Sequence, residues 1–167
     1  MRGKGFSLVE LVILMVAIGV VATIIFFTLK PSEVLEKSRD AQRFADMKML
    51  IQAVNRFLAE SHDFKGLTGP YSSIDAGFSS AASRQKIDGT GWLPLNFSSI
   101  SSGAPFSVLP LDPLNNVNHN YRLGVSYSNK TYEINGVFES PENTPKQAAD
   151  GGNNPTVYEL GTDLTIL

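Results

Sequence analysis

The strongest constraint on this chain is an uncharged, apolar run near its N-terminus. No Asp, Glu, Lys or Arg occurs between Leu11 and Leu29. At about 1.5 Å per residue, a helix of these 19 residues has nearly the length needed to cross the roughly 30 Å hydrocarbon core of a bilayer. The sequence therefore predicts a membrane-length helix.

The residues on either side of this run predict its orientation. Arg2 and Lys4 precede it, and positively charged residues tend to stay on the cytoplasmic side. A secretory signal also starts with basic residues, but its apolar core is shorter and ends in a small-residue cleavage site. Here the run ends in Thr28-Leu29-Lys30-Pro31. We therefore expect a retained single-pass segment with its N-terminus in the cytoplasm and the rest of the chain outside.

Glu10 lies at the edge of this apolar run. A carboxylate costs roughly 2.5–3.5 kcal/mol at a bilayer centre and less near the interface, so a compensating partner is expected. The surrounding residues, Lys4-Gly5-Phe6-Ser7-Leu8-Val9-Glu10, resemble the prepilin motif of type IV pilins and type II secretion pseudopilins. The resemblance implies cleavage after Gly5 by a membrane aspartyl peptidase, the prepilin peptidase, and N-methylation of Phe6. It also implies an inner-membrane assembly platform as a partner.

The motif has a physical interpretation of its own. Cleavage after Gly5 creates a positive amine on Phe6, four residues from Glu10, and residues at this spacing share one helix face. In a stack of subunits, the Glu10 carboxylate of one copy can meet the Phe6 amine of its neighbour and neutralise both charges. Glu10 is therefore predicted to act in filament assembly. The competing interpretation is a plain signal anchor in which Glu10 is incidental.

An amphipathic helix is predicted after Pro31, which either opens it or kinks one continuous helix. Apolar residues recur at helical spacing and are expected to face a core: Phe44, Met47, Ile51, Val54 and Leu58. Three charge pairs are expected on the exposed faces: Glu33 with Lys37, Asp40 with Arg43, and Arg43 with Asp46. Gly66, Gly69 and Pro70 indicate that the helix ends near residues 61–65.

The remainder predicts a small antiparallel sheet. Residues 66–110 are expected to be mostly loop, with Trp92 filling the core. Residues 121–127 and 131–138 are predicted to form a hairpin, and 156–160 a further strand. Together these features predict an α+β lollipop whose N-terminal helix packs on the sheet, and the resemblance to type IV pilins implies the same fold. Its expected parts are a leader peptide (1–5), a transmembrane and polymerisation helix (6–30), an amphipathic helix (31–62) and a globular head (63–167).

Composition argues against several other classes of function. The chain has no cysteine and only two histidines, His62 and His119, so a zinc enzyme is not expected. Asp112, Asp150, Glu159 and Asp163 are the best candidates for acid–base catalysis, but no catalytic motif accompanies them and no enzyme is predicted. No cofactor is expected, although calcium in the Asp- and Asn-rich C-terminal loops stays open. The net charge of −2, with mixed signs, neither supports nor excludes nucleic-acid binding.

The predicted function is a structural pilin subunit that assembles itself into a filament outside the cell or in the periplasm. The segment Leu111-Asp112-Pro113-Leu114-Asn115-Asn116 resembles, more weakly, the Asp-Pro segment of major pseudopilins and some pilins. Two alternatives stay open: the major pseudopilin of a type II secretion system, and a membrane-anchored binding domain that does not polymerise. Adhesion, motility, DNA uptake and secretion are not distinguished by the sequence.

Overall fold

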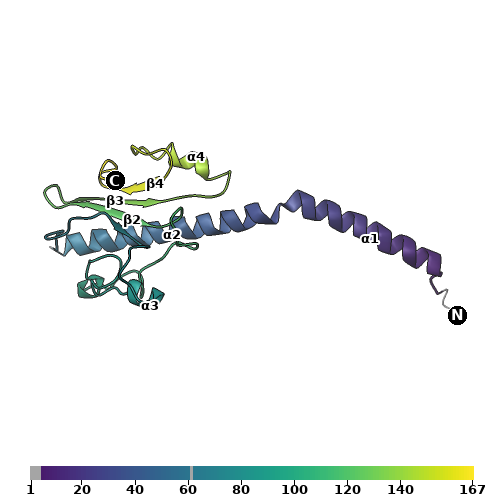
Figure 1. Cartoon of the computed structure of the whole chain (residues 1–167), viewed down its shortest axis with the longest axis horizontal. Coiled ribbons are helices and arrows are strands. Elements are labelled where there is room, and N and C mark those ends of the chain that lie inside the picture. The colour runs from purple at the N-terminus through teal and green to yellow at the C-terminus, as the bar shows by residue number, and fades with distance from the viewer. Residues whose placement is uncertain (1–4, 61) are drawn as a thin grey trace. The chain divides into compact units, whose positions relative to one another are not determined.

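The chain forms two compact units, Met1–Glu36 and Lys37–Leu167. The computed structural model describes residues 5–60 and 62–167 (Figure 1). The predicted leader falls partly outside the described residues, because the description starts at Gly5. The two units are described separately below.

The first unit is dominated by helix α1, Leu8–Leu29. Its 22 residues correspond to a length of about 33 Å. Its large apolar side chains between Leu8 and Phe27 are exposed, and Glu10 is its only charged residue. Within the described part of the chain, a single N-terminal helix is long and apolar enough to cross a membrane.

The break after α1 is made by Lys30, whose backbone is left-handed (φ 41°). A residue in this conformation commonly ends an α-helix. Helix α2, Pro31–Ala59, starts at the next residue. Pro31 therefore occupies the first helical position, where its missing N–H costs no hydrogen bond. The sequence left two roles open for Pro31, opening a second helix or kinking a continuous one, and the structure shows the first.

Helix α2 supplies one wall of the core of the second unit. Its buried apolar residues are Met47, Leu50, Ala53, Val54 and Phe57. The predicted apolar stripe was therefore partly wrong, because Phe44 is 38% exposed and Ile51 and Leu58 are only half-buried. The buried face is rotated toward Leu50 and Phe57. The helix also ends at Ala59, earlier than the expected 61–65.

Residues 66–110 are mostly loop, as predicted. They contain only short elements: strand β1 (Tyr71–Ser72), helix α3 (Ala81–Arg84) and a 3-10 turn (Phe97–Ser99). Trp92 is buried, and its Nε1–H donates to the carbonyl of Pro110 at 3.0 Å. The prediction that Trp92 fills the core is confirmed.

The sheet is four-stranded and antiparallel, with strand order β1-β2-β3-β4. Strands β2 (Arg122–Ser126) and β3 (Thr131–Gly136) form the predicted hairpin. Strand β4 (Tyr158–Gly161) is the further strand expected at 156–160. The sequence did not predict β1, which has two residues, or the short helix α4 (Thr144–Gln147).

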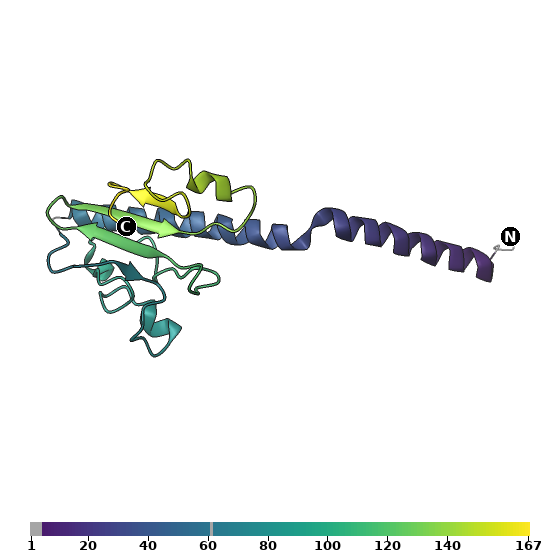
Figure 2. The same cartoon turned by 45° about the horizontal axis from the view of Figure 1, so that its top comes forward.

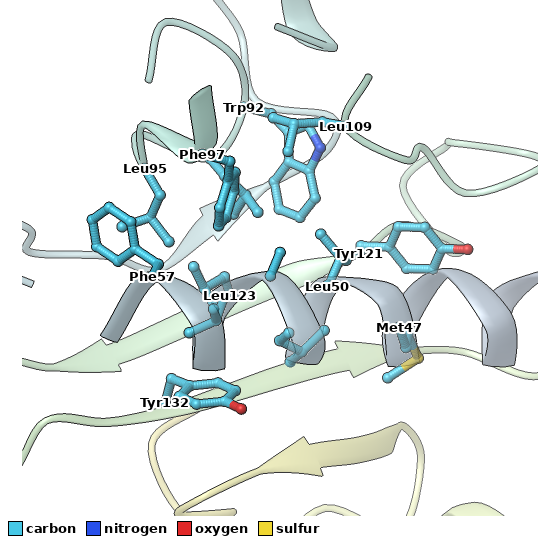
Figure 3. Packing of buried hydrophobic residues seen from close by; sticks show 14 of the residues in the cluster. Met47, Leu50, Phe57, Trp92, Leu95, Phe97, Leu109, Tyr121, Leu123 and Tyr132 are labelled. Carbon is cyan, nitrogen blue, oxygen red and sulfur yellow. The ribbon is translucent and has the colours of Figure 1, made fainter. Parts of the chain in front are cut away.

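The core lies between α2 and one face of the sheet (Figures 2 and 3). Leu123 comes from β2, and Tyr132 and Ile134 come from β3. The residues of segment 92–109 close the core from another side: Trp92, Leu93, Leu95, Phe97, Ile100 and Leu109. A long N-terminal helical region and a small antiparallel sheet therefore make this an α+β chain.

Candidate functional site

The predicted processing site lies directly before α1. Gly5 and Phe6 are exposed and are not in a helix. Phe6 is 79% exposed, and a side chain added at Gly5 would meet no described atom within 4 Å. A protease needs an accessible peptide, and the Gly5–Phe6 bond is accessible because both residues are exposed and lie outside the helix.

Glu10 is held in a capping box at the start of α1. The Ser7 N–H donates to Glu10 Oε2 at 2.8 Å, and the Glu10 N–H donates to Ser7 Oγ at 3.2 Å. Two N–H groups at the helix start are thereby satisfied. The sequence interpretation overlooked this role of Ser7, although the spacing Ser-x-x-Glu just before an apolar run is the known signature of a capping box.

The capping box leaves part of Glu10 available. It occupies Oε2, while Oε1 makes no hydrogen bond to any described residue. Glu10 can therefore hold the cap and offer its second oxygen to a cation from another molecule. The cation predicted from the sequence for this role is the Phe6 amine of a neighbouring copy, which would exist only after cleavage.

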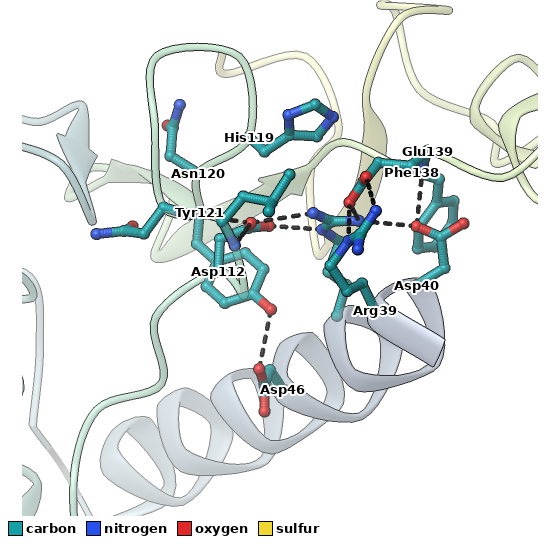
Figure 4. Close-up of polar contacts among 12 residues, drawn as sticks. Arg39, Asp40, Asp46, Asp112, His119, Asn120, Tyr121, Phe138 and Glu139 are labelled. Atoms are coloured by element: carbon teal, nitrogen blue, oxygen red, sulfur yellow. Dashed lines mark hydrogen bonds and ion pairs between the residues drawn. The ribbon is translucent and has the colours of Figure 1, made fainter. Parts of the chain in front are cut away.

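A second polar cluster lies inside the unit Lys37–Leu167, which is called the head from here on. Its carboxylates Asp112 and Glu139, labelled in Figure 4, surround Arg43 of α2. Arg43 Nε and Nη2 donate to Asp112 at 2.6 and 3.0 Å. Arg43 Nη1 contacts Asp40 at 2.9 Å and Glu139 at 2.5 Å. Arg43, Asp40 and Asp112 have fully buried side chains. The expectation that the Asp40–Arg43 pair is exposed is therefore wrong.

Asp40 anchors the chain segment that follows β3. Its Oδ2 accepts hydrogen bonds from the Ser140 N–H at 2.9 Å and from Ser140 Oγ at 2.6 Å. Its Oδ1 accepts from the Glu139 N–H at 2.9 Å. Burial acts to raise the pKa of Asp40, but the hydrogen bonds from Ser140, Glu139 and Asn143 outweigh it and the pKa is lowered. The cluster therefore favours an ionised Asp40.

Asp46 was expected to pair with Arg43 on an exposed face, and this prediction is also wrong. Asp46 is buried and accepts a hydrogen bond from the Tyr121 hydroxyl at 2.9 Å. Burial raises the pKa of Asp46, and the Tyr121 hydrogen bond partly opposes this. The Asp-Pro segment and the start of β2 are thus held to α2 by two separate contacts, through Asp112 and through Tyr121.

The four carboxylates considered for catalysis do not form one site. Asp112 is paired with Arg43, and Asp163 Oδ1 accepts a hydrogen bond from the Thr165 N–H at 3.2 Å. Only Asp150 and Glu159 are neighbours, through a hydrogen bond from the Glu159 N–H to Asp150 Oδ2 at 2.8 Å. Within the described ranges, no group of three His, Cys, Asp or Glu side chains could hold a metal ion. The calcium expectation stays a prediction.

Comparisons with protein-family models, curated proteins and solved structures give no match to this chain.

Proposed function

We propose that this chain is a structural subunit of a type IV pilus-like filament, anchored in the membrane by α1 before assembly and polymerised through it. The observation that carries the proposal is the N-terminal arrangement. An exposed Gly5–Phe6 peptide precedes a membrane-length helix whose only charged residue, Glu10, lies in its first turn. The capping box with Ser7 uses only one oxygen of that carboxylate, and a cation from another subunit would compensate the cost of its charge beside an apolar span.

The mechanism follows from the charges that processing would create. Prepilin peptidase would cut after Gly5 and methylate Phe6, leaving a positive amine on Phe6 just before the capping box. Glu10 Oε1 of one subunit would pair with the Phe6 amine of the next, away from water. Oppositely charged groups attract strongly in such surroundings, so the pair would set the axial stagger of neighbouring copies.

The apolar surface of α1 would supply the rest of the association. Its exposed side chains are compatible with lipid before assembly and with other copies of α1 afterwards. An assembly platform in the inner membrane would transfer subunits from one environment to the other. The compact unit Lys37–Leu167 would be displayed outside the membrane.

The test is the N-terminus of the mature protein. The full chain is produced in a host with an active prepilin peptidase, and its intact mass is measured. We expect loss of Met1 to Gly5 and gain of one methyl group. Gly5→Leu should accumulate as precursor, because a bulky side chain obstructs the cut, while Gly3→Leu, a change of the same size in the leader, should be processed. A protein that keeps Met1 to Gly5 in this host would contradict the proposal.

A further inference from the structure

Two glutamates are buried on the face of the sheet that points away from α2. Successive strand residues point to opposite faces, and Tyr132 and Ile134 of β3 pack in the core with α2. Glu133 of β3 therefore points the other way. So does Glu159 of β4, whose neighbour Leu160 packs against the core. Both glutamates have 0% exposure.

The register of the sheet brings these two side chains close together. Glu133 is opposite Gly161, and Glu159 is opposite Asn135. The glutamates are therefore diagonal neighbours on adjacent strands, a position from which two long side chains can reach each other.

Two chain segments cover the glutamates. Glu133 Oε2 accepts hydrogen bonds from the N–H groups of Ile166 at 2.7 Å and Leu167 at 2.9 Å. Glu159 Oε2 accepts from the Asn154 N–H at 3.1 Å. A side chain at Gly152 would collide with Glu159 Oε2, so the loop backbone lies directly on this carboxyl. The loop 150–154 and the segment 164–167 thus depend on the two glutamates for their attachment.

Each carboxyl uses only one of its oxygens in this attachment. Glu133 Oε1 and Glu159 Oε1 are buried and have no hydrogen-bond partner, and the same is true of Asn135 Oδ1. Neither glutamate forms an ion pair within the part of the chain that the structure describes. Two ionised carboxylates buried side by side repel each other, and each unpaired oxygen adds a desolvation cost.

One proton removes both costs. A protonated carboxyl is a donor, so a proton between the two Oε1 atoms gives each of them a partner and removes one negative charge. We propose that Glu133 and Glu159 share one proton as an acid–carboxylate pair, and that this proton fastens the loop 150–154 and the segment 164–167 to the sheet.

The charged groups that face the pair have opposite signs. Asp150 of the loop is acidic and accepts a hydrogen bond from the Glu159 N–H, while Arg122 of β2 shares this face of the sheet but is exposed. Asn135 and Gly161 on the strands are neutral. Burial raises the pKa of Glu159, and although the Asn154 N–H opposes this, the neighbouring Glu133 carboxyl and the charge of Asp150 raise it further. The net result is a pKa above the ordinary value for Glu.

A metal ion fits the space less well than a proton. Calcium takes six to eight oxygen ligands. The unpartnered oxygens here are those of Glu133, Glu159 and Asn135, and the other carboxyl oxygens of the pair already accept backbone N–H groups that a cation would displace. A proton needs only the two Oε1 atoms.

The sign of the pH effect follows from the raised pKa. A group that binds its proton more tightly in the folded state stabilises the fold at low pH and loses this contribution as pH rises through the folded-state pKa. Above that pH both carboxyls are charged and repel each other. The loop and the last segment should then detach, whether or not the chain forms filaments.

The first test compares wild type with Glu159→Gln, using the full chain in detergent micelles. The glutamine amide can donate permanently to Glu133 Oε1, so the variant imitates the protonated state. Between about pH 5 and about pH 8, the Tm of wild type should fall by about 5 °C more than that of Glu159→Gln. The control Glu142→Gln removes an exposed carboxylate that pairs with Lys37, and it should keep the wild-type pH dependence.

The second measurement needs no variant that might fail to fold. In wild type labelled with ¹³C in its Glu carboxyl groups, the buried Glu159 carboxyl should titrate with a pKa above that of ordinary Glu. Equal pH dependence of Tm in wild type and Glu159→Gln would overturn the proposal, as would ordinary titration of every Glu. So would a calcium-induced rise in Tm at about pH 8 that Glu159→Gln abolishes, because the site would then hold a cation instead.

Discussion

Arg43 and Asp112 form a bidentate ion pair, although they lie far apart in the sequence. Arg43 Nε is 2.6 Å from Asp112 Oδ2 and Nη2 is 3.0 Å from Oδ1, with both side chains fully buried. The pair joins α2 to the segment that leads into the sheet. Since Arg43 also contacts Asp40 and Glu139, one cation compensates three carboxylates, of which Glu139 has a second partner in Arg39.

Replacing Arg43 should destabilise the head strongly. Arg43→Met keeps much of the side-chain volume but leaves buried carboxylates without their cation, which costs about 3–5 kcal/mol of unfolding free energy. Arg43→Lys should lose an intermediate amount of unfolding free energy, because an ammonium group cannot reproduce the bidentate contact. The measurement is chemical denaturation of the full chain in micelles. The control is Arg122→Met, at an exposed position on β2, whose free energy of unfolding should stay within about 0.5 kcal/mol of wild type. Equal losses of stability in Arg43→Met and Arg122→Met would contradict the claim that Arg43 compensates the buried carboxylates.

The same cluster predicts how the head responds to acid. The folded-state pKa of Asp40 lies below its ordinary value, so its contribution to stability is present above the unfolded-state pKa and is lost as pH falls through the folded-state value. Wild type should therefore lose Tm steeply below about pH 4. Asp40→Asn should start from a lower Tm and fall less steeply, whereas Asp163→Asn, outside the cluster, should keep the wild-type slope. A parallel decline in all three proteins would exclude Asp40 as a source of acid sensitivity.

Two neighbouring positions on α2 test which helix face is buried. Leu50 has 0% exposure, whereas Ile51 is only half-buried. Leu50→Asp should prevent folding or cost several kcal/mol, because it places an unpaired charge in the core. Ile51→Asp should cost clearly less, because its carboxylate can reach water. Thermal melts of both variants test this assignment. A larger loss of Tm for Ile51→Asp than for Leu50→Asp would show that the buried face of α2 is assigned wrongly.

Local patterns in the sequence were enough to predict the hairpin and the core position of Trp92. The β-branched and aromatic residues of 121–127 and 131–138 flank a polar turn, and such signals depend on near neighbours only. The uncharged run between Leu11 and Leu29 likewise identifies α1 directly. These parts of the fold need no knowledge of distant contacts.

The polar interior of the head was not predicted, because it depends on distant residues. Asp40, Arg43 and Asp46 have the spacing of ordinary surface pairs, and charged residues are usually solvated. Their burial is created by Asp112, Tyr121 and Ser140, at least 69 positions further along the chain. The buried Glu133 and Glu159 are similar, since their cover comes from segments 150–154 and 164–167. At the N-terminus, by contrast, the role of Ser7 could have been found from Ser-x-x-Glu alone.

The capping box separates two roles of Glu10 that any assembly experiment must distinguish. Glu10→Gln keeps a side chain that can complete the box with Ser7 but removes the charge. Ser7→Ala does the reverse, since it removes the hydroxyl that caps the helix, at a cost of about 1 kcal/mol, and keeps the carboxylate. Glu10→Leu removes the charge and the side-chain half of the box, but the backbone N–H of residue 10 can still donate to Ser7 Oγ. If charge pairing drives assembly, Ser7→Ala should form filaments and both Glu10 variants should not.

The most direct test of the account is the filament yield of Glu10→Gln, relative to the pool of processed, membrane-inserted subunit. Sheared filaments and membrane fractions are quantified side by side for wild type, Glu10→Gln, Glu10→Leu and Ser7→Ala. We expect normal processing and insertion of all four, with filaments nearly absent for both Glu10 variants, because each broken contact costs about 3–5 kcal/mol and recurs at every subunit. A wild-type filament yield from Glu10→Gln at an equal membrane pool would contradict the claim that Glu10 drives assembly by pairing with the Phe6 amine.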